Sequence, residues 1–210
     1  LWPLSNDTRS KQFLSLLPSP SGGKESMIQR VVRQIRASLN DVDITFATNA
    51  VQRDSIINQL GDDISVVTEP ERRDTFPAIA LASYYLAKHE NCPKDEVVVV
   101  MPCDVFTEDG YFEAIAKMAQ AVHNDEADIL LMGVRPTEPS EKFGYIVPSA
   151  AKNGEYSFNV CKFIEKPDCE TAKLLLADGA CWNGGVFAFK LGYLMSIVSR
   201  YVKAESYAEV

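Results

Sequence analysis

Hydrophobic and polar positions follow two different periods along the first 134 residues of this chain. Segments with apolar residues three or four apart, such as SMIQRVVRQIRASL, have the spacing of an amphipathic helix, whereas short apolar runs between turn residues are typical of strands. The pattern predicts helices over 26–39, 49–61, 77–89 and 111–123, and strands over 43–48, 63–69, 96–101 and 128–134. Asn49 is a candidate cap for the second helix, and Gly61 follows its end.

Strict alternation of strand and helix indicates a doubly wound α/β sheet. The run EVVVVM at 96–101 supports this interpretation, because a continuous β-branched run is typical of a parallel strand buried on both faces. In such sheets, ligands bind outside the carboxyl ends of the strands.

After Val134 the regular alternation of strand and helix ends. The sequence there predicts a mixed β layer that extends the same sheet. A turn-rich segment leads to FNVCKFIEKP, a strand ended by Pro167, and Asp168 is a candidate cap for the helix CETAKLLLADG. The strand ACWNGGVFAFK and the helix LGYLMSIVSRYV follow. Because no linker separates independent units, we expect a single domain over residues 1–210.

Composition narrows the function classes. The chain has 210 residues, 46% of them hydrophobic, which is enough for one sizeable core. Its net charge of −8 argues against a general nucleic-acid binder, and its apolar runs are far too short to cross a bilayer. Five cysteines without C-x-x-C spacing suggest neither a disulfide framework nor a zinc site. A cytoplasmic protein is expected.

Asp104 is the first candidate for chemistry. It lies just past the carboxyl end of the most buried predicted strand, in MPCDVF. A carboxylate there is well placed to hold Mg²⁺, which binds through one or two carboxylates and substrate phosphates. The same position equally suits a residue that turns the chain or caps the next helix.

The segment EPERRDTFPAIA (69–80) places Arg73 at the same sheet edge, before a helix with Thr75 as a candidate cap and Pro77 in its first turn. Free amides and the dipole of that helix favour anions or ring acceptors. The alternative is a solvated charged loop.

Several later residues suit a ligand, although each also has a structural interpretation. Gly144 allows close backbone approach or forms a turn, and Glu165 with Lys166 forms a charged strand end or plain surface. Asn183 lies in WNGG, where its amide suits a hydroxyl-rich ligand or the glycines mark a β-bulge. By position alone, Lys11 is a surface residue.

Taken together in order, six stretches resemble the sugar-1-phosphate nucleotidyltransferases, and most closely the bacterial mannose-1-phosphate guanylyltransferases. LWPLSNDTRSKQF (1–13) resembles the second half of that family's Gly-rich loop, with Lys11 in register. The later signatures are matched by EPERRDTFPAIA, MPCDVF, PTEPSEKFGYI, FIEKP and WNGGVF. The resemblance implies a Rossmann-like nucleotidyltransferase fold of the GT-A type, with three layers around a mixed, mainly parallel central sheet. It also implies the reaction GTP + mannose 1-phosphate → GDP-mannose + diphosphate.

The resemblance carries residue roles with it. It implies catalytic roles for Lys11, Asp104 and Lys166, with Mg²⁺ held by Asp104. The implied nucleotide-binding residues are Trp2, Pro3, Leu4, Glu69, Arg73, Thr75 and Pro77. The implied sugar-phosphate-binding residues are Gly144, Tyr145, Glu165, Lys166, Asn183 and Gly184. The implied partners are GTP and mannose 1-phosphate, in a homo-oligomer that we expect to be a dimer.

The chain also departs from the family pattern. Asn6 and Ser10 stand where Arg and Pro are usual, the first half of the Gly-rich loop is not matched, and no second metal-binding Asp is matched after Val198. We therefore expect residues 1–210 by themselves to be inactive or very weak. Two alternatives stay open, a related enzyme that uses UTP, dTTP or ATP with glucose 1-phosphate, and a non-catalytic nucleotide-sugar-binding paralogue.

Overall fold

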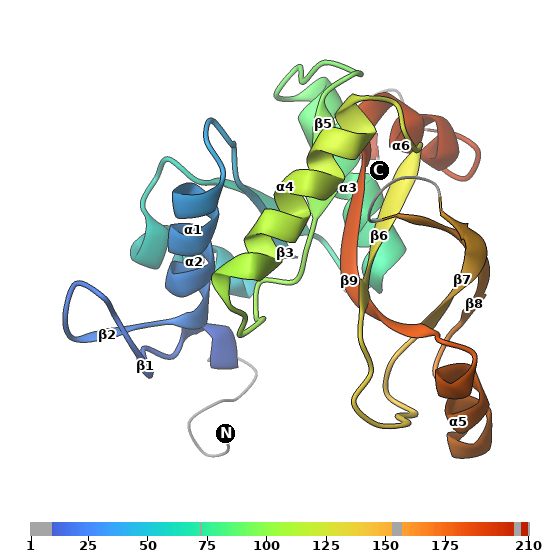
Figure 1. Cartoon of the computed structure of the whole chain (residues 1–210). Helices are drawn as coiled ribbons and strands as arrows, with labels where there is room; N and C mark the ends of the chain where they lie inside the picture. Colours follow the sequence, from blue (N-terminus) through green and yellow to red (C-terminus); the bar gives the residue numbers. More distant parts are fainter. Residues whose placement is uncertain (1–9, 72, 153–156, 204–206, 210) are drawn as a thin grey trace.

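The computed structural model describes residues 10–71, 73–152, 157–203 and 207–209 (Figure 1). Its helices are η1 (Lys11–Phe13), α1 (Met27–Ser38), α2 (Ala50–Leu60), α3 (Thr75–Lys88), α4 (Asp109–His123), α5 (Cys169–Ala177), α6 (Leu191–Val198) and η2 (Tyr207–Glu209). Its strands are β1 (Leu17–Pro18), β2 (Lys24–Glu25), β3 (Thr45–Asn49), β4 (Ser65–Glu69), β5 (Val97–Val100), β6 (Ile129–Val134), β7 (Tyr145–Lys152), β8 (Phe158–Ile164) and β9 (Cys181–Lys190). The predicted alternation of strand and helix up to Val134 is confirmed.

Two of the predicted helix caps are confirmed by hydrogen bonds. The Asn49 side chain accepts from the Gln52 N–H of α2 at 3.0 Å, and the Asp168 side chain accepts from the Thr171 N–H of α5 at 2.8 Å. Each bond satisfies one of the amides that a helix start leaves without a partner. Gly61 follows α2 with φ +94°, a conformation that favours glycine.

The described strands form three sheets, β1 with β2, β3 with β4, and the five strands β5 to β9, and parallel pairing is confined to β3 and β4. β3 and β4 pair in parallel, whereas β9 runs antiparallel to β5, β6 and β7, and β7 runs antiparallel to β8. β5 and β6 share one direction, yet they are not neighbours because β9 lies between them. Each valine of β5 is half-buried, and helices rather than a neighbouring strand cover its two faces, so the VVVV run carries no information about the direction of its neighbour.

Helices cover both faces of the five-stranded sheet around β5 and β9 and give three layers. On one face Phe112 and Ile115 of α4 pack with Val186, and Val99 joins this cluster. On the other face α3 and α6 form a second cluster with Phe189, which Val98 and Val100 join. Alternate residues of β5 therefore enter opposite cores, as the period of a strand requires. The α/β three-layer fold is confirmed.

Two smaller clusters lie elsewhere among the described residues. Ile28 of α1, Ile56 of α2 and Ile64 form a core with Phe13 of η1 at its margin, on the side of β3 and β4 (Figure 1). On the other side, Tyr145 of β7 packs with Ala172 and Leu175 of α5. The first of these clusters holds the turn that carries Lys11.

Candidate functional site

Lys11 and Asp104 form an ion pair at the carboxyl end of β5. Their Nζ and Oδ2 atoms are 2.7 Å apart, although the residues are far apart in the sequence. Lys11 comes from η1, and Asp104 follows β5 through the short segment Met101–Cys103. The structure thus brings two of the predicted catalytic residues together at the edge where α/β sheets bind ligands.

The pair is accessible, with 58% of the Lys11 side chain and 38% of the Asp104 side chain exposed. The hydrogen bond from Lys11 to the Asp104 carboxylate, and the charge of that carboxylate, raise the pKa of Lys11 above its ordinary value. Lys11 is therefore an ammonium at physiological pH. Burial raises the pKa of the neighbouring Cys103 thiol, so this side chain is neutral and adds no charge to the site.

The loop after Asp104 is held by α1 through contacts that the sequence pattern did not indicate. Arg30 Nη2 and Gln34 Nε2 both donate to the Thr107 carbonyl, at 3.3 and 3.4 Å. The Arg30 guanidinium also lies over the Phe106 ring, 4.6 Å from its centroid. Nothing in the helical spacing of Arg30 or Gln34 reveals a partner more than 70 residues away.

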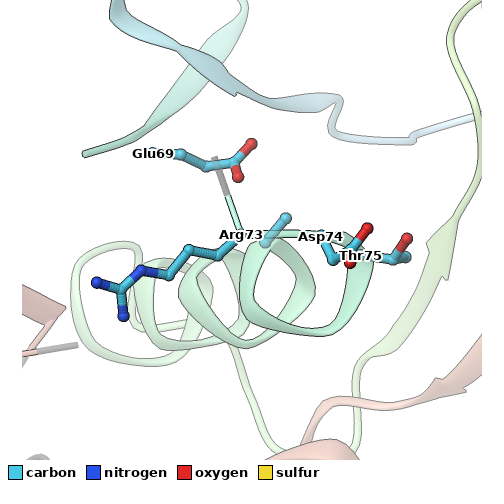
Figure 2. A pocket seen from close by; sticks show the side chains of 5 residues that line it. Glu69, Arg73, Asp74 and Thr75 are labelled. Carbon is cyan, nitrogen blue, oxygen red and sulfur yellow. The ribbon is translucent and has the colours of Figure 1, made fainter. Parts of the chain in front are cut away.

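A hollow of about 640 Å³ lies where β4 leads to α3, lined by Glu69, Arg73, Asp74, Thr75 and Ala78 (Figure 2). Three predicted nucleotide-binding residues, Glu69, Arg73 and Thr75, are thereby together. Arg73 pairs with Glu71 at 2.6 Å, and Figure 2 shows its guanidinium extending away from the Thr75 hydroxyl.

The predicted cap at Thr75 is wrong, because Thr75 is already the first residue of α3. The cap position belongs to Asp74, which has φ +69° and makes no side-chain capping hydrogen bond. A left-handed Asp is an unusual helix entrance, and a propensity argument favours Thr or Ser in β-type backbone instead. Pro77 lies in the first turn, as predicted, and is exposed.

Gly144, Glu165 and Asn183 form a second group. The Asn183 N–H donates to the Gly144 carbonyl at 2.7 Å. A Cβ on Gly144 would lie 2.6 Å from Glu165 Oε2, so only glycine lets that carboxylate come so close. Lys166 is beside Glu165, with Nζ and Oε1 3.5 Å apart and both side chains exposed.

The Gly pair of WNGG lies in an irregular stretch of β9, as its structural interpretation predicted, because Leu131 pairs with Phe187 whereas Gly133 pairs with Asn183. Gly184 lies where a Cβ would be 3.1 Å from the Met132 carbonyl, so it allows β6 to approach β9. Gly185 has φ +70° and packs near Pro102, and its N–H donates to Asn183 Oδ1 at 3.1 Å. Pro102 lies between β5 and Asp104, so Gly185 links the two groups of site residues. The two adjacent glycines indicated an irregular backbone, but the sequence did not show which of them adopts a positive φ.

Tyr145, a predicted sugar-phosphate residue, has its side chain in the core. Its side chain is fully buried, and its hydroxyl accepts from the Ser140 N–H at 2.8 Å and donates to the Ser140 carbonyl at 3.0 Å. These bonds satisfy the phenol, so the ring is part of the core and holds the 140–145 turn closed. Trp2, Pro3 and Leu4 lie outside the described residues.

The described part of the chain contains no group of three or more His, Cys, Asp and Glu side chains arranged around a metal position. In the same part, no helix is both long and apolar enough to cross a membrane.

Comparison with known proteins gives the family. The nucleotidyl transferase family model matches residues 1–209. Xanthan biosynthesis protein XanB of Xanthomonas campestris pv. campestris (strain B100) is 31% identical over 209 residues, covering 97% of this chain. A mannose-1-phosphate guanylyltransferase of Klebsiella pneumoniae is 29% identical, covering 96% of this chain. The chain spans 42% of the length of each of these relatives.

Solved structures agree. A Thermus thermophilus protein described as a mannose-1-phosphate geranyltransferase superposes with a TM-score of 0.78 at 27% identity, covering all of this chain and 62% of the other. The resemblance seen in the six sequence stretches is confirmed at the level of the family and the fold. This chain belongs to the nucleotidyl transferase family.

Proposed function

We propose that the protein is a mannose-1-phosphate guanylyltransferase, which forms GDP-mannose and diphosphate from GTP and mannose 1-phosphate. The observation that carries the proposal is the 2.7 Å pair of Lys11 and Asp104 at the carboxyl end of β5. The family match over residues 1–209 supports a nucleotidyl transfer. Relatives named mannose-1-phosphate guanylyltransferase, which match 96% of the chain, support the choice of substrates.

In this reaction a phosphate oxygen of mannose 1-phosphate bonds to the α-phosphorus of GTP, and the bond to diphosphate breaks on the opposite side. The protein needs to supply position and charge rather than a covalent intermediate. Lys11 is a cation with three donors, of which Asp104 engages one, so the others can bind phosphate oxygens as negative charge develops.

Asp104 suits a magnesium ion by its donor chemistry. Its carboxylate is partly exposed at the same edge, and Mg²⁺ is commonly bound by one or two carboxylates together with substrate phosphates. Bound there, the ion would neutralise phosphate charge. We propose Mg²⁺ as the cofactor on this basis.

The two remaining groups of residues have proposed roles on either side of this pair. The hollow lined by Glu69, Arg73 and Thr75 is proposed to take the nucleotide, near the start of α3 and Pro77. The sugar phosphate is proposed to lie by the second group, with Glu165 and Asn183 toward its hydroxyls and Lys166 toward its phosphate. Gly144 and Gly184 would contribute backbone there, as would Tyr145.

The deciding experiment offers the purified protein, expressed from its full reading frame, a matrix of GTP, UTP, dTTP and ATP with mannose and glucose 1-phosphates and Mg²⁺. Products are separated by anion-exchange chromatography and identified by mass. GDP-mannose is the expected main product. Preference for UTP with glucose 1-phosphate would overturn the guanylyl assignment, and no product in any combination would favour a binding paralogue.

Asp104→Asn is the variant to run beside it. It keeps the shape of the side chain and removes its charge, so we expect product formation to fall by at least about 100-fold. We further propose a cytoplasmic homodimer, for which light scattering of the purified protein measures the mass.

A further inference from the structure

The turn that carries Lys11 is bound on both of its flanks by one helix. Gln52 Nε2 donates to Ser10 Oγ at 2.7 Å, and Gln59 Nε2 donates to the Phe13 carbonyl at 2.9 Å. The two glutamines are separated by about two turns of α2, so both side chains leave the same face of that helix.

Each glutamine amide is oriented by a hydroxyl group on its other side. Thr48 Oγ1 donates to Gln52 Oε1 at 2.9 Å, and Ser26 Oγ donates to Gln59 Oε1 at 2.6 Å. Because each amide oxygen already accepts a hydrogen bond from a hydroxyl, its NH₂ group faces η1. Two hydrogen-bonded chains therefore lead to the flanks of Lys11, one from Thr48 through Gln52 and one from Ser26 through Gln59.

The two flanks of η1 differ in what else supports them. Phe13 also packs against the Ile28, Ile56 and Ile64 cluster, and Leu14 after it is buried. Ser10 is a small polar residue that brings no apolar side chain to this core. Among the described residues, the hydrogen bond from Gln52 is the side-chain contact that holds this flank.

We propose that Gln52 is a positioning residue, which acts through Ser10 to direct Lys11 toward Asp104. The proposal rests on the function proposed above. The Lys11 side chain is 58% exposed, so packing does not set its direction, and the backbone of η1 must do so. A turn released at Ser10 would let the ammonium leave the 2.7 Å contact with Asp104.

The backbone at Ser10 offers a selective test. Ser10 has φ −69° and ψ 149°, which are values that a proline ring imposes and tolerates. A proline at this position would fix φ covalently and would make the Gln52 bond unnecessary. The Ser10→Pro change should therefore compensate for loss of Gln52 and should not compensate for loss of Gln59.

The experiment compares Gln52→Leu and Gln59→Leu, each alone and combined with Ser10→Pro, with the wild type. Gln120→Leu is the matched control, because Gln120 on α4 bonds only to the exposed Asn124 among the contacts that the structure shows for it. Hydrogen exchange is measured at the Phe13 and Leu14 amides, which donate to the Ser10 and Lys11 carbonyls at 3.1 and 3.2 Å. Steady-state kinetics give kcat and KM for GDP-mannose formation.

We expect Gln52→Leu to speed exchange at these amides by about threefold to tenfold, the effect of losing one neutral hydrogen bond. The same variant should lower kcat by a similar factor and leave both KM values nearly unchanged. Adding Ser10→Pro should restore exchange and kcat in Gln52→Leu only.

Unchanged exchange in Gln52→Leu, or failure of Ser10→Pro to restore it, would overturn the positioning role. A wild-type protein without nucleotidyl transfer would instead refute the proposed function, and exchange would still decide whether Gln52 holds η1.

Discussion

Replacing Gly144 with alanine tests whether Glu165 is held at a functional distance. The added Cβ would lie 2.6 Å from Glu165 Oε2 and 3.0 Å from Phe163 Cζ. An ordinary contact needs about 3.4 Å, so the carboxylate must retreat by about 0.8 Å. Glu165 is exposed and can move, which makes the change cheap for folding but not for a ligand that the carboxylate touches.

The expected result is a loss in sugar-phosphate use with little loss in stability. Displacements of about 1 Å in positioning groups cost up to about 100-fold, so we expect KM for mannose 1-phosphate to rise by roughly 10-fold to 100-fold. Gly144 has no positive φ, so alanine fits its backbone, and the free energy of unfolding should change by less than about 1 kcal/mol. KM for GTP should stay close to the wild-type value.

The assay varies mannose 1-phosphate at saturating GTP and is paired with chemical denaturation of the same variant. Gly110→Ala is the control, because a Cβ there meets nothing within 4 Å and helix α4 gains an alanine. A wild-type KM for the sugar phosphate in Gly144→Ala would show that the position of Glu165 does not matter for this substrate. A defect confined to the KM for GTP would show that Glu165 does not contact the sugar phosphate.

Three further predictions concern charge and packing. Lys11→Met should lower kcat by about 100-fold or more, as steady-state kinetics will measure. Because its ion pair with Asp104 is exposed, the same change should alter the free energy of unfolding by less than about 1 kcal/mol in chemical denaturation. Arg33 donates to both oxygens of buried Glu25 and lowers the pKa of that carboxyl, so Glu25→Gln should cost about 1–3 kcal/mol at pH 7. Because the folded pKa is the lower one, this stabilisation is present above the unfolded pKa of Glu25 and is lost as pH falls through the folded value, so denaturation of wild type and variant should converge in acid. Ile56→Ala should destabilise by about 2–5 kcal/mol, since Ile56 is 2% exposed, and exposed Val51→Ala on the same helix should change stability far less.

Local rules predicted much of the fold. Asn49 and Asp168 cap their helices because a side-chain oxygen next to a helix start needs only its own neighbours as partners. The VVVV run correctly predicted a strand with apolar cores on both faces, although each valine is only half-buried, and this pattern does not depend on the neighbouring strand's direction. Because the apolar pattern is the same for parallel and antiparallel neighbours, it did not predict that β9 pairs antiparallel with β5.

The site depended on contacts that no local pattern contains. Lys11 looks like a surface residue until Asp104 is placed beside it, and only the family resemblance suggested that. Tyr145 stands in a signature stretch, yet its hydroxyl is satisfied within its own turn at Ser140. Gln52 had no signal at all, because its partner Ser10 becomes adjacent only after α2 packs beside η1.

The insertion of β9 between β5 and β6 also sets an order of events during synthesis. Val100 pairs with Phe187, so β5 leaves the ribosome 87 residues before the strand that covers its edge exists. At a synthesis rate of about 5–20 residues per second, the valine run stays without its β9 partner for roughly 4–17 s. During that interval it is a nascent, unpaired apolar segment of the kind that chaperones bind, and slower elongation between residues 134 and 181 would lengthen its exposure.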